Sequence, residues 1–417
     1  MRVIQAATLD VGGAARAMLR LQKGLLDIGT DSRVLVAEKR SSLPYVEEWK
    51  GDMATLSRIQ RRSRKAFLDW SIDRALRKKP EGFDFFSDDR SRFGSHTVSA
   101  LNSADLVNLH WIARFVDVSK VFPKLKSPVV WTLHDEHAFT GGCHYDFGCR
   151  RWREGCGKCP QLGSEVNSDF SSKAWERKKE SYRHIGKSLT IVTPSRWLGK
   201  MASESPLLGD QRIEVIPYGV PTEIYHPGAR EGLRAAFRLE RDDRALLFVS
   251  DRLSNRRKGF GVLEQALARL PVPKNGRLVV FSIGLGSRTE IGGFPLYHLG
   301  TLEREELVAA AFAAADFFVA PSLQDNLPNT VLESLACGTP VIGSNVGGIP
   351  DMVRPKETGW LFDGGDPESL KRTIESALTS SNLPEMRERC REVAVLEYSM
   401  EVQARKYRDL YEQILAK

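Results

Sequence analysis

The stretch APSLQDNLPNTVLESLACGTPVIGSNVGGIPDMV, residues 320–353, decides the fold of this 417-residue chain. It starts at the end of an apolar run, continues as a polar loop and a helical pattern from near Asn329, and then enters a second apolar run. Strand, helix and strand in this order indicate a parallel sheet with a crossover helix. Because N–H groups and the helix dipole favour an anion at the helix start, a diphosphate would fit there.

Two acidic residues and a glycine pair add the chemistry of a sugar-nucleotide site to this stretch. Asp325 precedes the helix, and Glu333 lies just over one turn inside it. Carboxylates accept hydrogen bonds from the vicinal hydroxyls of a sugar or a ribose. At Gly347 and Gly348 the backbone can approach a ligand closely, because these residues have no side chain. Taken alone, Asp325 would more often be a helix cap and Glu333 a solvent-facing acid.

The same alternation of short apolar runs and helical patterns extends along the chain in both directions. Strands are predicted in the first half at 2–7, 32–37, 106–111, 128–134 and 189–195, and in the second at 245–250, 277–284, 317–322 and 339–345. We therefore predict an α/β fold of two Rossmann-like, doubly wound domains that face a central cleft. Ligands of such open sheets lie beyond the carboxyl ends of the strands.

The predicted domain boundaries follow from where this alternation is interrupted. An N-terminal Rossmann-like domain is predicted at 1–212, with a cysteine-rich insertion at 140–162. A stretch rich in proline and glycine, 213–229, is the predicted linker, and 230–395 is the predicted C-terminal Rossmann-like domain. Residues 396–417 read as an amphipathic terminal helix that packs back on the N-terminal domain.

Composition and charge place the chain among soluble proteins with an anionic partner. The chain is 41% hydrophobic and 27% charged, it has neither a signal-peptide pattern nor a long uncharged apolar run, and its formal net charge is +8. We expect a cytoplasmic protein. Residues 57–79 concentrate basic side chains around apolar ones, which predicts a basic amphipathic helix. This helix either covers the domain core or contacts an anionic membrane surface, and nucleic acid is not the expected partner.

Four cysteines lie close together in the predicted insertion: Cys143, Cys149, Cys156 and Cys159. Four thiols that end in a C-x2-C pair can hold a tetrahedral zinc ion. Locally packed free thiols and disulfides are the alternatives. A zinc ion held by four thiolates would be structural, because no coordination position would remain open for catalysis.

The motifs of residues 321–351 together resemble those of family 4 of the retaining glycosyltransferases, which have the GT-B fold. That family has a Pro-Ser strand end, two acidic residues eight apart, a small-residue run ending in Gly-x-Pro-Val, and a Gly-Gly-hydrophobic-Pro-acid turn. The corresponding positions here are Pro321–Ser322, Asp325 with Glu333, 336–341 and 347–351. The first acid is usually Glu in the family. Asp325 resembles the variant of a subgroup that acts in bacterial exopolysaccharide assembly of colanic-acid type.

The resemblance implies that 1–212 binds the acceptor and that 230–395 binds the nucleotide sugar, with charged residues on both sides of the cleft. Lys258, which precedes a glycine, and Arg252 would stabilise the leaving diphosphate, while Asp325, Glu333 and His134 would orient the donor. The spacing from Arg252 to Lys258 is one residue longer than usual, so Arg256 or Arg257 could replace Arg252. His110, at the end of another predicted strand, is a further candidate, and Asp135 could orient His134 or cap the next element. Further donor contacts are implied for Gly12, Gly13, Gly300, Thr301, Leu302, Asn326, Asn329, Thr330 and Val331.

The resemblance thus implies a retaining hexosyltransferase. A hexose would move from a nucleoside-diphosphate sugar to an acceptor hydroxyl by front-face attack, without a catalytic metal. The implied acceptor is a lipid-linked oligosaccharide in exopolysaccharide biosynthesis, at the inner face of the plasma membrane. Two alternatives remain open. One is a GT-B epimerase or hydrolase of nucleotide sugars, and the other is a noncatalytic basic module that binds nucleic acid or membrane but leaves the donor motifs unexplained.

Overall fold

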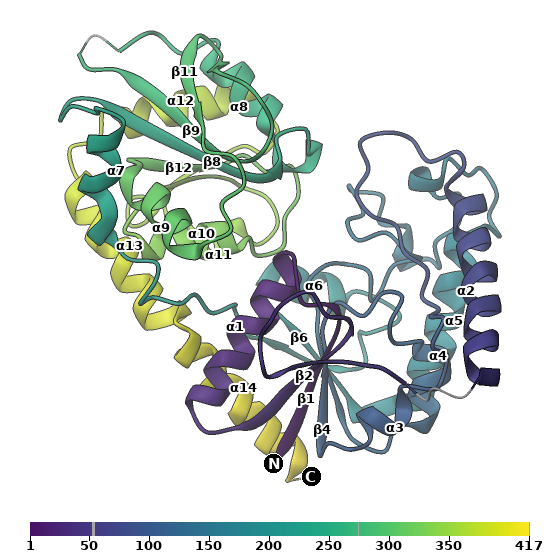
Figure 1. Cartoon of the computed structure of the whole chain (residues 1–417). Coiled ribbons are helices and arrows are strands. Elements are labelled where there is room, and N and C mark those ends of the chain that lie inside the picture. Colours follow the sequence, from purple (N-terminus) through teal and green to yellow (C-terminus); the bar gives the residue numbers. More distant parts are fainter. Residues whose placement is uncertain (52–54, 274, 417) are drawn as a thin grey trace. The chain divides into compact units, whose positions relative to one another are not determined.

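The computed structural model describes residues 1–51, 55–273 and 275–416, and of residues 55–58 it describes the backbone alone. The side chains of residues 57 and 58, at the start of the predicted basic helix at 57–79, therefore lie outside the described structure. The chain divides into two compact units, Met1–Pro217 with Gln403–Lys417, and Tyr218–Val402. Each unit is built on a sheet of parallel strands with helices between them (Figure 1), so the predicted class of two Rossmann-like domains is confirmed.

In the described part of the N-terminal unit, seven parallel strands form one sheet in the order β3-β2-β1-β4-β5-β6-β7. They are β1 (Arg2–Leu9), β2 (Asp31–Glu38), β3 (Val46–Glu48), β4 (Leu106–Leu109), β5 (Val129–Thr132), β6 (Leu189–Thr193) and β7 (Arg212–Val215). The strands β4, β5 and β6 are buried throughout, as expected for a parallel sheet covered on both faces. The order reverses between β1 and β4, and this switch point is where such sheets bind ligands.

The helices of this unit include one from the far end of the chain. They are α1 (Gly13–Asp27), α2 (Thr55–Leu76), α3 (Val98–Leu101), α4 (Val118–Val121), α5 (Phe170–Ile185), α6 (Arg196–Ser203) and α14 (Met400–Leu415). The last helix is tied to the sheet by buried tyrosines: Asn108 Nδ2 donates to Tyr411 Oη at 2.8 Å, and Thr132 Oγ1 lies 3.0 Å from Tyr407 Oη. Residues 403 onward therefore pack within the N-terminal unit.

The sheet of the C-terminal unit has the order β10-β11-β9-β8-β12-β13-β14 in the described residues, with β10 alone antiparallel to its neighbour. Its strands are β8 (Arg244–Arg252), β9 (Leu278–Leu285), β10 (Glu290–Ile291), β11 (Phe294–His298), β12 (Phe317–Ala320), β13 (Val341–Ser344) and β14 (Gly359–Phe362). Its helices are α7 (Arg230–Ala236), α8 (Phe260–Leu267), α9 (Glu305–Ala314), α10 (Asn329–Ala336), α11 (Ile349–Met352), α12 (Pro367–Leu378) and α13 (Leu383–Tyr398). Here the order reverses between β8 and β12.

The predicted linker is wrong at its N-terminal end. Strand β7 lies within 212–215, pairs with β6, and belongs to the N-terminal unit, which extends to Pro217. Its sequence, Arg-Ile-Glu-Val, has no apolar run, because an edge strand is covered on fewer sides than a central one. The short polar strand β3 at the opposite edge is absent from the predicted strands for the same reason. Among the described residues, no helix is both long and apolar enough to cross a membrane.

Candidate functional site

The candidate donor site lies at the switch point of the C-terminal sheet, where β8 and β12 end. After β8 the chain forms a short 3-10 helix, Arg256–Lys258, and after β12 it forms the loop that leads into α10. Leu323 N donates to Arg257 O at 2.7 Å, so the two loops are joined through their backbones. The helix α10 begins directly after Pro328, whose extended backbone cannot continue a helix backwards. The basic segment that contains Lys258 and the loop that carries Asp325 therefore lie against each other.

Asp325 is buried between two cations on the neighbouring loop. Lys258 Nζ lies 2.6 Å from Asp325 Oδ2, Arg257 NH1 lies 3.3 Å from Asp325 Oδ1, and Ser322 Oγ donates to Oδ2 at 3.1 Å. Burial raises the pKa of the Asp325 carboxyl, but Lys258, Arg257 and Ser322 outweigh burial and bring the net pKa below its usual value. Asp325 is therefore ionised at neutral pH and holds both cations in place.

Two glycines make this close approach of loops sterically feasible. Gly259 and Gly347 have φ angles of 74° and 58°, which side-chain-bearing residues rarely adopt. A Cβ atom on Gly259 would lie 1.8 Å from Pro321 O, and one on Gly347 would lie 1.8 Å from Asp325 O. The glycine after Lys258 and the first glycine of the Gly-Gly pair therefore let two chain segments pass against the loop that carries Asp325.

The other predicted donor residues around α10 differ in exposure. Glu333 is 0% exposed, so the solvent-facing alternative for this acid is wrong. Asn326 and Val331 are also buried, whereas Asn329 and Thr330, in the first turn of α10, are half-buried. At the start of α10, Asn329 and Thr330 are therefore partly exposed to solvent, whereas Glu333 is fully buried.

The arginine that partners Lys258 is Arg257 in this structure. Arg257 NH1 contacts Asp325 and donates to Gln324 O at 3.0 Å. Arg252, the predicted partner, is exposed at the end of β8, and Arg256 is exposed as well. The 3-10 turn accounts for the difference, because it places Arg257 and Lys258 against the loop after β12 and leaves Arg256 on its outer side.

The remaining predicted donor residues lie in loops after strand ends. Gly300 has a φ of 69°, and its carbonyl accepts from Gly284 N at 2.9 Å; Thr301 is exposed and Leu302 is half-buried. In the N-terminal unit, Gly12 precedes α1 and Gly13 is its first residue; both are exposed, and a Cβ on either glycine would meet no described atom within 4 Å. Packing thus does not require glycine at 12 or 13, although the positive φ of Gly12, 99°, favours it.

In the N-terminal unit, the predicted His134 and His110 form a stacked pair at the ends of β5 and β4. His110 Nδ1 lies 2.9 Å from His134 Nε2, and His110 Nε2 lies 2.7 Å from Gln5 Oε1. Burial lowers the pKa of His134 to about 4, and burial with the neighbouring His134 lowers the pKa of His110. Both rings are therefore neutral at pH 7, and both line a small pocket with Trp111 and Asp135.

A second histidine network, which the motif analysis missed, adjoins this pocket. His144 Nδ1 lies 2.6 Å from Asp135 Oδ2, Trp111 Nε1 donates to the same oxygen at 3.0 Å, and His144 Nε2 lies 2.9 Å from Ser87 Oγ. Asp135 thus binds Trp111 and His144, and it also accepts from His137 N at 2.9 Å, which caps the turn that follows β5, one of the two roles predicted for it. In the sequence, His144 directly follows Cys143, and this position inside the cysteine-rich segment is the only sign of the network that the sequence offers.

The four clustered cysteines lie in the segment that follows this network. Cys143 and Cys159 are buried, Cys149 and Cys156 are half-buried, and none of them forms a disulfide in the described structure. Residues 155–158 all have positive φ, including Cys156 at 62° and Lys158 at 43°. In the part of the chain that the structure describes, no group of three or more His, Cys, Asp or Glu side chains is arranged to hold a metal ion. Zinc at this site therefore stays a prediction.

Comparison with known protein families matches the C-terminal unit. Residues 233–395 match the model of a family described as Glycosyl transferases group 1. D-inositol 3-phosphate glycosyltransferase of Mycobacterium sp. (strain KMS) is 32% identical over 184 residues, which are 40% of this chain and 40% of that protein. Sulfoquinovosyl transferase SQD2 of Arabidopsis thaliana is 28% identical over 206 residues, which are 47% of this chain and 39% of that protein. The chain spans about two fifths of the length of these curated relatives.

Solved structures resemble the whole chain. Anabaena Alr3699/HepE in complex with UDP-glucose superimposes with a TM-score of 0.68 and 15% identity, over 99% of this chain and 100% of that chain. Sucrose-phosphate synthase (tll1590) from Thermosynechococcus elongatus gives a TM-score of 0.67 and 16% identity, over 100% of both chains. The chain therefore has the two-domain GT-B fold predicted from its sequence, and its residues 233–395 carry the sequence pattern of the group 1 glycosyl transferases.

Proposed function

We propose that the protein is a retaining glycosyltransferase that moves a hexose from a nucleoside-diphosphate sugar to an acceptor hydroxyl. The observation that carries this proposal is the cluster of Lys258, Arg257 and Asp325 beside the start of α10, in a segment that matches the group 1 glycosyl transferases. Two cations against one carboxylate leave a net charge of +1 (2 − 1) at this place. A cluster with net positive charge attracts an anionic ligand.

The cluster acts on the leaving diphosphate. As the bond between the anomeric carbon and the phosphate oxygen breaks, negative charge grows on the diphosphate, and Lys258, Arg257 and the N–H groups at the start of α10 stabilise it. Asp325 fixes both cations beforehand, so little reorganisation is needed when charge develops. Retention at the anomeric carbon follows from front-face attack within the ion pair, in which the departing phosphate oxygen takes the acceptor's proton.

The donor's sugar is held by the remaining predicted residues in this proposal. Glu333 and His134 orient the sugar, and Gly300 to Leu302 contact the base through their backbones. His134 is neutral at pH 7, so its ring can accept or donate a hydrogen bond with a sugar hydroxyl. Since Anabaena Alr3699/HepE was solved with UDP-glucose, UDP-glucose is the first donor to test. No divalent metal is needed for this step.

The proposed acceptor is a lipid-linked oligosaccharide used in exopolysaccharide assembly. The support is the Gln-Asp-Asn-Leu-Pro-Asn variant of the motif around Asp325 and the basic helix at 57–79. The named relatives widen the set to test, because one is an inositol 3-phosphate glycosyltransferase and another a sulfoquinovosyl transferase. A place at the cytoplasmic face of the plasma membrane follows from such an acceptor.

Calorimetric titration with a panel of UDP-, GDP- and ADP-sugars tests the donor part of the proposal. We expect one nucleotide sugar to bind, and incubation of that donor with membrane extracts to transfer its labelled hexose to lipid. Absence of binding by every member of the panel would refute the transferase and leave the noncatalytic module. Hydrolysis or epimerisation of the donor without any acceptor would instead favour the epimerase or hydrolase alternative.

Replacing Lys258 by Ala tests the leaving-group role. We expect turnover to fall roughly 100-fold or more, because a charge that stabilises the transition state is removed. Arg257→Ala should lower turnover as well, since Arg257 shares Asp325 with Lys258. Arg252→Ala is the matched control, as this arginine is exposed at the end of β8. Wild-type turnover of Lys258→Ala, or a larger loss in Arg252→Ala than in Arg257→Ala, would show that the diphosphate lies elsewhere.

A further inference from the structure

The helix α2 is fixed to the N-terminal unit by one of its faces. Leu68 and Ile72 are buried, and Ile72 packs in a cluster that includes Cys143 and Cys159 of the cysteine-rich segment. Arg64 NH2 donates to Asp117 Oδ2 at 2.7 Å. This face is occupied by protein, so the predicted covering of the domain by the helix is borne out for these residues.

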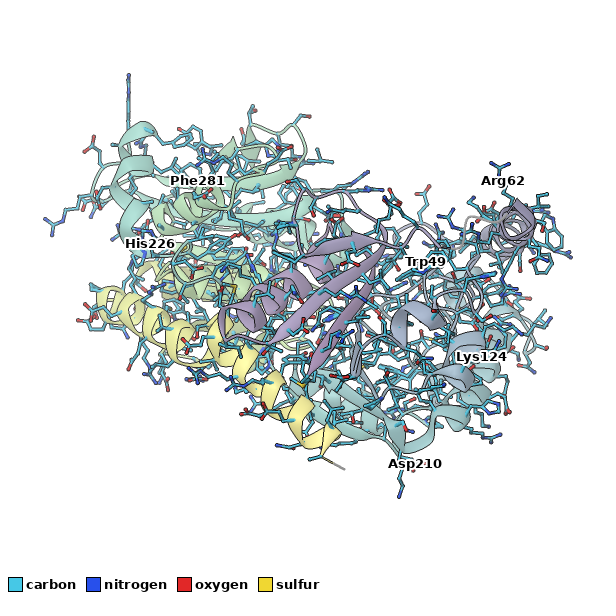
Figure 2. All side chains as sticks on the ribbon, turned by 60° about the horizontal axis from the view of Figure 1, so that its bottom comes forward. Trp49, Arg62, Lys124, Asp210, His226 and Phe281 are labelled. Atoms are coloured by element: carbon cyan, nitrogen blue, oxygen red, sulfur yellow. The ribbon has the colours of Figure 1, made fainter. Side chains whose placement is uncertain are left out.

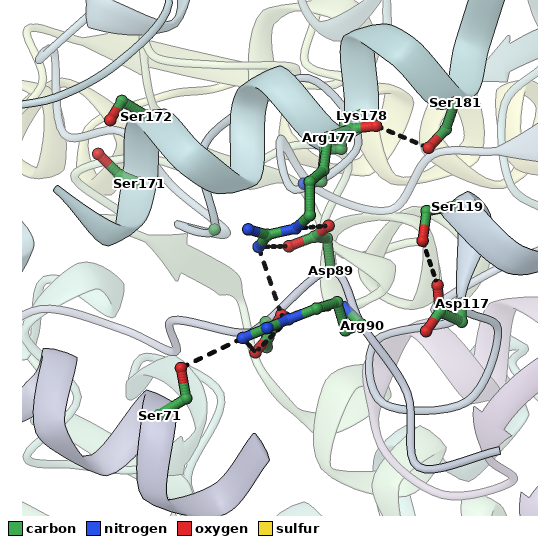
Figure 3. Close-up of polar contacts among 12 residues, drawn as sticks. Ser71, Asp89, Arg90, Asp117, Ser119, Ser171, Ser172, Arg177, Lys178 and Ser181 are labelled. Carbon is green, nitrogen blue, oxygen red and sulfur yellow. Dashed lines mark hydrogen bonds and ion pairs between the residues drawn. The ribbon is translucent and has the colours of Figure 1, made fainter. Parts of the chain in front are cut away.

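A buried ion-pair network holds the loop beneath α2. Arg90 NH2 donates to Ser71 Oγ on α2 at 3.2 Å and to Asp88 Oδ2 at 2.8 Å, while Arg177 on α5 pairs with Asp89 (Figure 3). The same contacts therefore connect α2, the loop at 88–90 and α5. Since both carboxylates are buried, loss of a partner would leave an uncompensated charge, and the network reaches α2 through the hydrogen bond from Arg90 to Ser71.

The opposite face of α2 carries large apolar side chains that point into solvent. Ile59, Phe67 and Trp70 are 59%, 55% and 57% exposed, although their spacing of eight and three residues places them on one side of the helix. The rings of Phe67 and Trp70 lie 6.2 Å apart. In the printed sequence these residues read as one apolar set with Leu68 and Ile72, but the structure divides the set between two faces.

Basic side chains surround this exposed apolar group. Arg62 extends outward from α2 (Figure 2), Arg74 lies 5.5 Å over the ring of Trp70, and Arg77 follows the last turn. Arg62, Arg74 and Arg77 have no carboxylate partner within the described ranges. Asp73 adds one negative charge to the same side, which leaves a net charge of +2 (3 − 1). The face thus combines apolar tips with unneutralised positive charge.

We propose that this outward face of α2, defined by Ile59, Arg62, Phe67, Trp70, Arg74 and Arg77, docks on an anionic lipid bilayer. Aromatic and aliphatic tips enter the boundary between headgroups and acyl chains, and the arginines pair with lipid phosphates. The inference goes beyond the transfer reaction, because it requires neither a particular donor nor a particular acceptor. It places the N-terminal unit, which is the proposed acceptor side, against the surface where a lipid-linked acceptor would lie.

The apolar tips distinguish a bilayer from nucleic acid. Ile59 has no ring on which a base could stack, and its exposure gains nothing beside a phosphate backbone. Phe67 and Trp70 could stack on bases, so duplex DNA and single-stranded RNA belong in the test as competitors. A second copy of this chain would also cover the face, and the oligomeric state in solution decides that case.

Co-sedimentation with lipid vesicles tests the proposal. We expect the full chain to bind phosphatidylcholine vesicles that contain phosphatidylglycerol, to bind weakly to phosphatidylcholine alone, and to dissociate as salt is raised. Equal binding to both vesicle types, or no binding to either, would overturn the proposal. Tighter binding to DNA or RNA than to the anionic vesicles would overturn it in favour of nucleic acid.

Paired substitutions show which side chains are responsible. Phe67→Ala with Trp70→Ala should weaken binding to anionic vesicles about tenfold, because apolar area no longer enters the membrane. Val272→Ala with Leu396→Ala is the control, since both residues are exposed apolar side chains of the C-terminal unit. Unchanged binding of the first pair, or an equal loss in the control pair, would overturn the proposal.

Charge substitutions complete the test. Arg62→Gln, Arg74→Gln and Arg77→Gln together should weaken binding by roughly fivefold per charge. The control removes three exposed cations elsewhere, in Arg372→Gln, Arg405→Gln and Lys406→Gln. Circular dichroism confirms that the folds are intact. A dimer in solution that the Phe67 and Trp70 substitutions dissociate would overturn the proposal, because a second copy would then cover the face.

Discussion

Gly347 has a role in the donor site that its missing side chain explains. A Cβ atom at this position would lie 1.8 Å from the carbonyl oxygen of Asp325, so Gly347→Ala must displace the loop that carries Asp325 and thereby disturb its ion pair with Lys258. We expect this variant to lose nucleotide-sugar binding in calorimetry. Gly293→Ala is the control, because its φ of 88° is also positive but no described atom lies within 4 Å of the added Cβ. It should keep binding and lose only about 1 kcal/mol of unfolding free energy.

Individual residues of the donor site could be named from the sequence more readily than their contacts. Asp325, Glu333 and Lys258 follow from the resemblance of their motifs to those of the glycosyltransferase family, and the structure brings Lys258 and Asp325 together. The choice of Arg257 over Arg252 depends on a 3-10 turn and on the left-handed conformation of Gly259, which periodicity does not encode. The buried state of Asp325 likewise depends on backbone that comes from another loop.

At the scale of elements, the cysteine-rich segment supports α2, and its metal content can be measured. Its turn at 155–158 keeps Cys156 and Lys158 in left-handed conformations, which cost energy unless other interactions compensate. We expect elemental analysis of protein purified without chelators to give one equivalent of zinc, and Cys149→Ser with Cys156→Ser to abolish it. Zinc well below one equivalent in the unsubstituted protein would contradict the prediction, and the segment would then hold free thiols.

The elements that were predicted correctly are those with a continuous apolar run. Strands β4, β5 and β12 are buried throughout, so apolar residues dominate their sequences, and the polar exceptions, Asn108 and Thr132, contact tyrosine hydroxyls of α14. The edge strand β7 is polar and was assigned to the linker. In helix α2, apolar character alone does not predict burial, because the buried Leu68 and the exposed Phe67 are adjacent in sequence and both apolar. Which of them is buried depends on the face by which α2 packs on the N-terminal unit, and the sequence does not encode that choice.

For the molecule as a whole, buried histidines couple folding of the N-terminal unit to pH. Burial lowers the pKa values of His110, His134 and His137 below their usual value, to about 4 for His134. Between pH 6.5 and 4 the unfolded chain therefore binds protons that the folded chain does not. Stability is fully present above pH 6.5 and falls as the pH drops, by up to about 1.4 kcal/mol per pH unit for each histidine. Asp89, whose pKa burial raises, opposes this loss in part.

This coupling predicts a lower urea midpoint at pH 5.0 than at pH 7.5. Tryptophan fluorescence measures it for the N-terminal unit, because seven of the eight tryptophans lie there. His137→Gln should reduce the difference between the two midpoints, because the His137 ring is buried against His144 and the glutamine that replaces it does not bind a proton. His184→Gln is the control, as its side chain is 52% exposed and should leave the difference unchanged. Equal midpoints at both pH values would mean that water reaches these histidines, and the neutral state assigned to His134 in donor binding would then fail as well.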